Sequence, residues 1–364
     1  MSTTIRSSSY DIFIGNDSFF QLEKYLGKTY PGRKLFVLVD EHTKDKCLPL
    51  ISGRVAALEN AVILEIESGE QHKSLSSCEK LWKQLTEHRA DRRSLLINLG
   101  GGMLSDIGGF VAATYMRGID FLNIPTTLLA MVDASAGGKN GINFSGLKNQ
   151  VGTFTKPGAV FISPSFLQTL PVRELKSGFA EVIKHTLIAD RDKWDELKSV
   201  ENLETVNWTK IIDQSVYIKN RIVTADYRER NMRKALNFGH TIGHALESYS
   251  LKNAGDPLKH GEAIAIGMMG EIYLSQKMLN FPDHDAEEIC SFIRKHYGHL
   301  SIDANADAML ELIRADKKNE QSEVNFALLR NIGEPVINQT PTEAMIKEAL
   351  EFSFQSRMSG IHEG

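Results

Sequence analysis

The first half of the chain alternates short apolar runs with stretches of helical periodicity, and no other feature limits the fold as strongly. Residues 35–39, 62–66 and 95–99 form such runs, each closed by polar or glycine residues. Runs of this length and composition are typical of strands buried in a parallel sheet. Further strands are expected at 121–124 and 160–162. Because helical patterns separate the runs, we predict βαβ units and an α/β domain.

The pattern changes near Leu170-Pro171, after which long helical periodicities dominate. We predict helices over residues 174–188, 210–224, 239–249 and 261–279. Thr340-Pro341-Thr342-Glu343 has the composition of a capped helix start with proline at the first position. The expected boundary therefore divides the chain into an α/β domain at 1–172 and an all-α domain at 173–364.

Composition excludes several classes of function. The net charge of −4 gives no global attraction to nucleic acid or to an anionic membrane. The N-terminus lacks the apolar core of a signal peptide, and no stretch approaches the length of a membrane span. The three cysteines, Cys47, Cys78 and Cys290, lie far apart, which favours a reducing cytoplasm over a disulfide framework.

A glycine-rich turn follows the third apolar run. Gly100, Gly101 and Gly102 begin a segment that ends at Asp106 and opens a helical pattern over residues 107–113. Glycines at a strand-to-helix turn allow backbone amides to approach an anion, and the helix N-terminus favours negative charge. The turn predicts a pyrophosphate cradle for a dinucleotide, although a ligand-free tight turn would use the same residues. Asp40, at the end of the first run, suits ribose hydroxyls or an ordinary surface turn.

Histidines and a glutamate form the second constellation. His240 and His244 are separated by one helical turn, His260 begins the next helix, and Glu181 lies on an earlier one. Imidazole and carboxylate ligands from three helices suit Zn²⁺ with an open coordination position. Spacing alone suggests His240 and His244 as a ligand pair, although two histidines at this spacing are usually partly exposed or hydrogen-bonded core residues that bind no metal.

Several cations stand in apolar or glycine-rich surroundings, where they suit phosphate or carboxylate groups. Any one of them, taken alone, is as easily a solvated surface residue. They are Arg117, Lys139, Lys148, Lys184, Lys219, Arg233 and Lys317.

Together these motifs resemble the 3-dehydroquinate synthase family over about residues 67–333. The blocks that carry the likeness are residues 69–73, 100–106, 115–118, 125–133, 137–139, 148–149, 170–174, 180–184, 237–245, 260–262 and 316–319. The resemblance implies a Rossmann-like NAD domain, an all-helical metal domain and an active site in the cleft between them. Asn140, Leu147 and Lys234 depart from the common family residues, but none of these changes removes a functional side chain.

The resemblance also assigns roles to individual residues. It implies that Zn²⁺ or Co²⁺ is held by Glu181, His240 and His260, which moves His244 from the metal to the substrate or a proton path. Implied NAD contacts are Asp40, Glu70, Lys73, Gly101, Gly102, Asp106, Thr126, Thr127, Lys148 and Thr169. Implied catalytic and substrate residues are Asp133, Lys139, Asn149, Lys184, Lys219, Arg233, Asn237, His244 and Lys317. The family is usually dimeric, and Arg117 is expected to reach the neighbouring subunit's site.

The reaction implied is the conversion of 3-deoxy-D-arabino-heptulosonate 7-phosphate to 3-dehydroquinate and phosphate, a step of the shikimate pathway to aromatic amino acids. It proceeds by transient oxidation with NAD, phosphate elimination, re-reduction and aldol closure. Expected phosphate contacts are Lys139, Asn149, Lys184, Lys317 and Arg117, and expected carboxylate or hydroxyl contacts are Arg233 and Lys219.

Three other functions compete with this one. Another sugar phosphate cyclase, making a valiolone or an inosose, would not need the carboxylate contact expected at Arg233 and Asn237. A metal-dependent polyol or glycerol phosphate dehydrogenase would release NADH and not recycle it. A regulatory protein that kept the fold is disfavoured, because every catalytic side-chain type is present.

Overall fold

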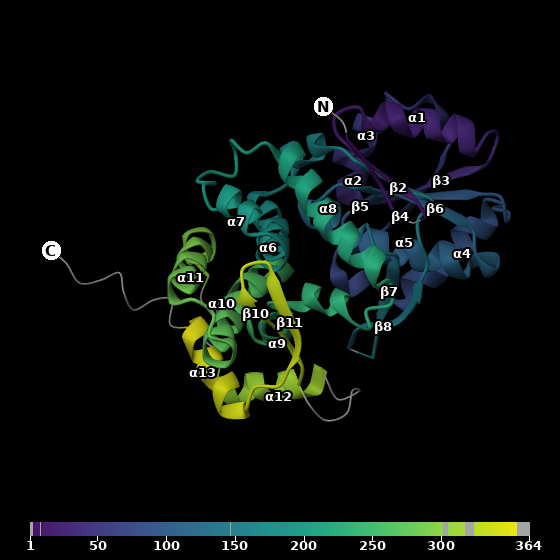
Figure 1. Cartoon of the computed structure of the whole chain (residues 1–364). Helices are drawn as coiled ribbons and strands as arrows, with labels where there is room; N and C mark the ends of the chain where they lie inside the picture. Colours follow the sequence, from purple (N-terminus) through teal and green to yellow (C-terminus); the bar gives the residue numbers. More distant parts are fainter. Residues whose placement is uncertain (1–2, 8, 146, 301–304, 317–323, 355–364) are drawn as a thin grey trace. The chain divides into compact units, whose positions relative to one another are not determined.

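The computed structural model describes residues 3–7, 9–145, 147–300, 305–316 and 324–354 (Figure 1). These residues group into two compact units. The first contains the chain up to Leu175 together with Asn207–Thr224, and the second contains Lys176–Val206 and the described residues from Ala225 onward. The division proposed from the sequence, 1–172 and 173–364, differs from this grouping mainly in the helix near residue 215.

A seven-stranded sheet forms the centre of the first unit, in the order β1-β2-β9-β6-β5-β3-β4. All neighbouring strands are parallel except β1 and β2. The expected parallel sheet is thus confirmed, whereas β1 and β2 were not predicted. The strands are β1 (Thr3–Arg6), β2 (Asp11–Ile14), β3 (Leu35–Asp40), β4 (Val62–Ile66), β5 (Leu95–Gly100), β6 (Asp120–Pro125) and β9 (Ala159–Ile162).

The direction in which the sheet grows reverses between β3 and β5. From β3 the chain adds β4 on one side, and then returns to add β5 on the other side of β3 and β6 beyond it. Asp40 ends β3 and Gly100 ends β5, so both lie at the carboxyl ends of the two strands at this switch point. In open α/β sheets, ligands bind in the crevice formed there.

Helices cover both faces of this sheet. In Figure 1, α1 and α3 lie on one side, and α4 and α5 lie on the other. Phe36 and Leu38 of β3 join a buried cluster with Leu81 of α4 and Ile107 of α5. Alternate residues of a strand face opposite sides, so the intervening β3 residues point toward the other layer. The helices are α1 (Ser18–Thr29), α2 (Glu41–Lys46), α3 (Leu48–Ser52), α4 (Leu75–Glu87) and α5 (Gly102–Thr114).

The first unit also contains a hairpin of β7 (Lys139–Phe144) and β8 (Leu147–Phe154), and helix α8 (Trp208–Ala225). Predicted over 210–224, α8 is confirmed as a helix. Its Lys219 binds Asp133 of the first unit, with the Lys219 Nζ 2.6 Å from Asp133 Oδ1. Short helical turns complete the description: η1 (Ala56–Leu58), η2 (Glu70–His72), η3 (Tyr115–Arg117), η4 (Ala130–Ala134), η5 (Pro164–Thr169) and, in the second unit, η6 (Met232–Asn237).

The second unit is mainly helical, as predicted, with one hairpin of β10 (Phe326–Asn331) and β11 (Glu334–Gln339) that was not predicted. The last helix begins at Glu343, and the Thr342 hydroxyl accepts the backbone N–H of Met345, so Pro341 precedes the helix and is not its first residue. Among the described residues, the helices are all too short or too polar to cross a membrane. The helices of the second unit are α6 (Val172–Ala189), α7 (Arg191–Leu197), α9 (His240–Asn253), α10 (His260–Leu279), α11 (Asp283–Tyr297), α12 (Ala306–Asp316) and α13 (Glu343–Phe354).

Helices α9 and α10 approach each other through glycines. A Cβ added at Gly267 of α10 would lie 2.2 Å from the Gly239 carbonyl oxygen and 2.7 Å from the Gly243 nitrogen. Both of these atoms belong to the backbone, which cannot rotate away as a long side chain can. The two helices can therefore lie this close together only because Gly267 has no side chain.

We expect Gly267→Ala to lower the free energy of unfolding by about 1–3 kcal/mol, because the methyl group must push α9 and α10 apart. Thermal and urea unfolding would measure the loss. Gly27→Ala is the matched control: Gly27 lies in helix α1 with no atom within 4 Å of its added Cβ, so alanine should stabilise that helix slightly. Equal stability of Gly267→Ala and the unaltered protein would contradict the packing argument.

Candidate functional site

Helix α6 presents a buried ion pair one turn apart. The Glu181 side chain is fully buried, Lys184 is 1% exposed, and the Lys184 ammonium contacts Glu181 Oε2. Burying a carboxylate is costly unless a cation or hydrogen-bond donor compensates for lost water. Lys184 provides that compensation for one carboxylate oxygen, while the other, Oε1, faces two histidines.

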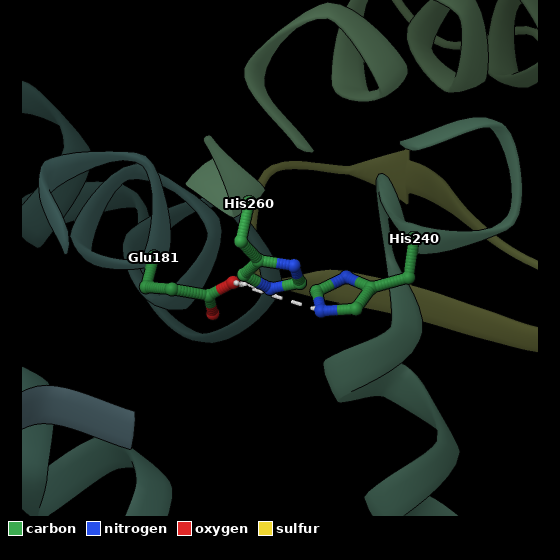
Figure 2. A group of neighbouring side chains, drawn as sticks. All are labelled: Glu181, His240 and His260. Atoms are coloured by element: carbon green, nitrogen blue, oxygen red, sulfur yellow. Dashed lines mark ion pairs between the residues drawn. The ribbon is translucent and has the colours of Figure 1, made fainter. Parts of the chain in front are cut away.

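Those histidines are His240, the first residue of α9, and His260, the first residue of α10 (Figure 2). The Nε2 atoms of both lie 3.6 Å from Glu181 Oε1. One possible ligand atom from each of the three residues lies within 4.8 Å of the others. The sequence thus placed all three on separate helices, and the fold brings them to one point.

Each imidazole is held through its other ring nitrogen. His240 Nδ1 lies 3.1 Å from the Phe238 carbonyl oxygen, and His260 Nδ1 lies 3.3 Å from Glu247 Oε2. If both Nδ1 atoms donate, both Nε2 atoms carry a lone pair directed toward Glu181. Metal-binding histidines are held in this way by a carbonyl or carboxylate, which fixes the tautomer and the ring plane.

The two imidazoles differ in their electrostatic surroundings. Burial lowers the pKa of His240 well below its ordinary value, so this ring is neutral and able to bind a metal. Burial acts in the same direction on His260, but the Glu181 and Glu247 carboxylates outweigh it and raise the pKa of His260 to about 9. A divalent cation would replace that proton, because histidine binds metals only when its ligating nitrogen is unprotonated.

His244 takes a different place from the one that its spacing suggests. Its ring centroid lies 5.2 Å from that of His240 and 5.9 Å from that of His260. The group of possible ligands, however, contains His260 and Glu181 with His240. Two nitrogens and a carboxylate oxygen are the donors of a three-ligand zinc or cobalt site with an open position, so the residues present suit such an ion.

In the turn formed by Gly100, Gly101 and Gly102 of the first unit, neighbouring side chains leave little room for a Cβ atom. A Cβ at Gly100 would lie 2.0 Å from Leu104 Cδ1, and one at Gly102 would lie 3.0 Å from the Ala134 Cβ. At Gly101 it would lie 3.3 Å from Thr127 Cγ2. The turn ends at the N-terminus of α5, where unpaired amides favour an anion, so its position suits the pyrophosphate that the sequence predicts.

Two predicted cofactor residues take part in the local backbone structure. Asp40 is 9% exposed, and its Oδ1 accepts the Thr43 N–H at 2.7 Å, which caps helix α2. The Thr126 N–H donates to the Gly100 carbonyl at 3.0 Å. Both residues therefore help to shape the switch point whether or not a ligand is bound.

Lys73 connects three segments beside this turn. Its Nζ lies 2.6 Å from Asp106 Oδ2 and 3.5 Å from Glu70 Oε1. Burial disfavours the ammonium, but Asp106 and Glu70 together raise the pKa of Lys73 above its ordinary value. Asn143 of β7 donates to Glu70 Oε1 at 3.0 Å, and its Oδ1 accepts the Asn149 N–H at 3.0 Å. Asn143 was not predicted, since a single asparagine in a strand carries no signal.

Asp133 lies in η4, a single turn of π-helix. Such turns occur often at functional sites. Lys219, 5% exposed, donates to both the carboxylate and the backbone carbonyl of Asp133, at 2.6 and 2.5 Å. The structure thus joins two predicted catalytic residues that are far apart in the sequence.

Arg233 and Asn237 lie in η6, which precedes α9. Arg233 is 4% exposed, and its Nη1 donates to the Tyr227 carbonyl at 2.6 Å while its backbone N–H donates to Asp226. Asn237 Nδ2 donates to Glu229 Oε1 at 3.0 Å. Arg233 therefore braces the segment before η6, and Glu229 is a further polar residue here that the sequence did not reveal.

The remaining predicted residues are exposed or lie outside the description. Lys317 falls among the residues that the structure does not describe. The exposed ones are Arg117, Lys139, Lys148, Asn149 and Thr169.

Comparison with known sequences identifies the family. The sequence profile for the N-terminal domain of 3-dehydroquinate synthase matches residues 63–177, and that for the C-terminal domain matches residues 178–319. A 3-dehydroquinate synthase of Parabacteroides distasonis is 46% identical over 96% of this chain and 99% of its own length. Another, from Geobacillus thermodenitrificans, is 39% identical over 98% of this chain and 99% of its own length.

Solved structures show the same fold at lower identity. A 2-deoxy-scyllo-inosose synthase complexed with carbaglucose-6-phosphate, NAD⁺ and Co²⁺ has a TM-score of 0.85 at 24% identity, covering 96% of this chain and 99% of its own. The valiolone synthase ValA of Streptomyces hygroscopicus, with NAD⁺ and Zn²⁺ bound, has a TM-score of 0.82 at 24% identity, covering 96% and 98%. A glycerol dehydrogenase of Schizosaccharomyces pombe reaches 0.63 at 18%, covering 98% and 90%. By its sequence, over both domains, this chain belongs to the 3-dehydroquinate synthase family.

Proposed function

We propose that the protein is an NAD- and metal-dependent 3-dehydroquinate synthase, a carbon–oxygen lyase that releases phosphate from 3-deoxy-D-arabino-heptulosonate 7-phosphate. The observation that carries the proposal is the convergence of Glu181, His240 and His260, with both imidazoles oriented through Nδ1. It occurs in a chain 46% identical to a 3-dehydroquinate synthase over nearly the full length of both.

The cofactor residues of this chain suit the groups bound in the inosose and valiolone synthase structures, which are NAD⁺ with Co²⁺ or Zn²⁺. Glu181, His240 and His260 would hold Zn²⁺ or Co²⁺, and the turn at Gly101 and Gly102 would receive the NAD pyrophosphate. When bound, the metal promotes loss of a proton from a substrate hydroxyl, and NAD⁺ takes up and returns a hydride. Asp40 would accept hydrogen bonds from the ribose hydroxyls through Oδ2, the carboxylate oxygen that does not cap α2.

The side chains proposed to bind the substrate are cationic or carry amides. Lys184, held beside Glu181, would attract phosphate or a developing oxyanion near the metal. Lys219 is fixed by Asp133, so its ammonium would orient a hydroxyl without needing to move. Arg233 and Asn237 would bind the substrate carboxylate. Further phosphate contacts proposed are Lys139, Asn149, Lys317 and Arg117.

The alternative functions share the fold but not the sequence. The inosose and valiolone synthases are 24% identical to this chain, and the glycerol dehydrogenase is 18% identical. Relatives at 46% and 39% identity are 3-dehydroquinate synthases. We therefore prefer the acid substrate, and we retain from the resemblance the proposals of a homodimer and of a cytoplasmic location.

We expect chelation to abolish phosphate release and Zn²⁺ or Co²⁺ to restore it. His240→Ala should lose the metal, because it removes one of three ligands. His244→Ala is the matched control on the same helix, and it should keep the metal while losing rate. Metal analysis of the purified variants, together with a phosphate assay, measures both effects. Stoichiometric zinc in His240→Ala would show that the ligands are assigned wrongly.

NAD⁺ should be needed in catalytic amounts, because the hydride that it takes up is returned to the substrate in each turnover. Many phosphates should therefore be released for each NAD⁺ present. Absorbance at the NADH maximum, recorded beside phosphate release, tests this expectation. Accumulation of one NADH for each substrate consumed would instead place the protein among the dehydrogenases.

We expect Arg233→Lys to remain folded, to keep its metal, and to lose about ten- to a hundred-fold in kcat/KM, the equivalent of one hydrogen bond to a charged group. Lysine cannot reproduce the planar pair of donors that a carboxylate accepts. Lys234→Gln is the control, since it removes the neighbouring cation, whose Nζ donates to Asn338. Near-normal kcat/KM in Arg233→Lys would remove the argument for a carboxylate-bearing substrate.

A further inference from the structure

Helix α10 buries two acids: Glu262 in its first turn, which accepts the Lys259 N–H, and Glu271 in its apolar interior. The helix contains a nearly continuous buried stretch from Gly261 to Ile272, and Glu271 in that stretch is fully buried. A carboxylate in such surroundings needs donors close by, because burial removes the water that would otherwise solvate it. Glu271 must therefore be paired, and its partners indicate what it does.

Backbone amides at the start of α9 donate to Glu271. Gly239 N–H donates to Oε2 at 2.6 Å, and Thr241 and Ile242 N–H donate to Oε1 at 3.1 and 3.4 Å. These amides lie on both sides of His240. The carboxylate thus holds the backbone immediately before and immediately after the proposed metal ligand.

The start of α9 depends on this arrangement because it has no cap of its own. Gly239, at the cap position, has a φ of 80° and no side chain to accept the free amides. The first turn of a helix leaves backbone N–H groups unsatisfied, and an anion there is also favoured by the helix dipole. Glu271 supplies both the acceptors and the charge from a neighbouring helix.

Orientation of the His240 ring follows from the same segment. His240 Nδ1 pairs with the carbonyl of Phe238, the residue directly before Gly239. A shift of the backbone at 238–242 would move both the Cα of His240 and the carbonyl that sets its ring plane. The carboxylate therefore acts on the direction of His240 Nε2 through the backbone.

We propose that Glu271 is a positioning residue for the metal site: it fixes His240 so that Nε2 meets the ion together with Glu181 and His260. The proposal rests on the metal site of the proposed function. It assigns to Glu271 a specific effect on metal affinity, beyond the contribution to stability that any buried hydrogen-bonded group makes. Loss of contacts outside the ligand shell typically costs about ten- to a hundred-fold in metal affinity.

Ser275 provides the matched control. It lies one turn further along α10 and is fully buried. Its hydroxyl accepts the Leu329 N–H at 3.0 Å and donates to the Glu271 carbonyl at 2.7 Å, so it anchors β10 to α10. Ser275→Ala should lower stability through loss of a buried hydrogen bond, without changing the metal site.

The experiment is a Co²⁺ titration of the full-length protein after chelation, followed by the visible absorption of the bound ion, with thermal unfolding of the same samples. The proteins compared are the unaltered one, Glu271→Gln, Glu271→Asp and Ser275→Ala. Glutamine keeps the volume but replaces one acceptor oxygen with an NH₂ group, and aspartate keeps the charge but shortens its reach. We expect both Glu271 variants to bind Co²⁺ at least about ten-fold more weakly, with altered absorption, and Ser275→Ala to bind normally.

The outcomes separate the two proposals. No Co²⁺ uptake by the unaltered protein would contradict the metal site itself. Normal uptake by the unaltered protein and by a folded Glu271 variant, with only the melting temperature lowered, would overturn the positioning role. If Glu271→Gln fails to fold, Glu271→Asp decides: equal affinity overturns the role and weakened affinity supports it.

Discussion

Close backbone contact between α10 and its two neighbours sets the geometry of the second unit. At Gly267, α10 meets the backbone of α9, and at Gly261 it meets α6, where an added Cβ would lie 1.8 Å from the Ser177 carbonyl oxygen. The Ser177 hydroxyl also accepts the Gly261 N–H at 3.0 Å. Since α6 carries Glu181 and α9 carries His240, these glycine contacts fix both residues relative to His260. The three side chains converge because their helices cannot move apart without breaking buried contacts.

Much of the fold could be predicted because its longer elements are strongly periodic. The helices expected at 174–188 and 261–279 appear as α6 and α10, and the apolar run at 95–99 appears as β5. Hairpins escaped prediction: β8 is almost entirely exposed and β11 has no fully buried residue, so neither sequence has a buried face. The place of α8 also escaped, because its contacts with Asp133 and Arg6 join segments far apart in the sequence, which no periodicity reveals.

The candidate site was predicted by residue type more than by position. The spacing of the histidines suggested His240 with His244, and only the family resemblance replaced His244 by His260, because that choice depends on how the helices pack. Glu271 did carry a signal that was not used. It is an acid inside a helix that is apolar on all sides, and such a helix is buried, so the acid must have partners. Asn143 and Glu229 gave no comparable signal, since polar residues in short strands and loops are common.

The ion pair on α6 has a consequence for the electrostatics of the whole molecule. The ammonium of Lys184 already offsets the charge of Glu181, so a divalent cation held there would leave this small region with surplus positive charge. The chain as a whole carries −4. Outside the protein, in solution, electrostatic fields are screened within about 8 Å at physiological ionic strength. A polyanionic sugar would therefore be retained by its immediate neighbours and not drawn in from a distance, so its arrival should depend on diffusion and its retention on local charge.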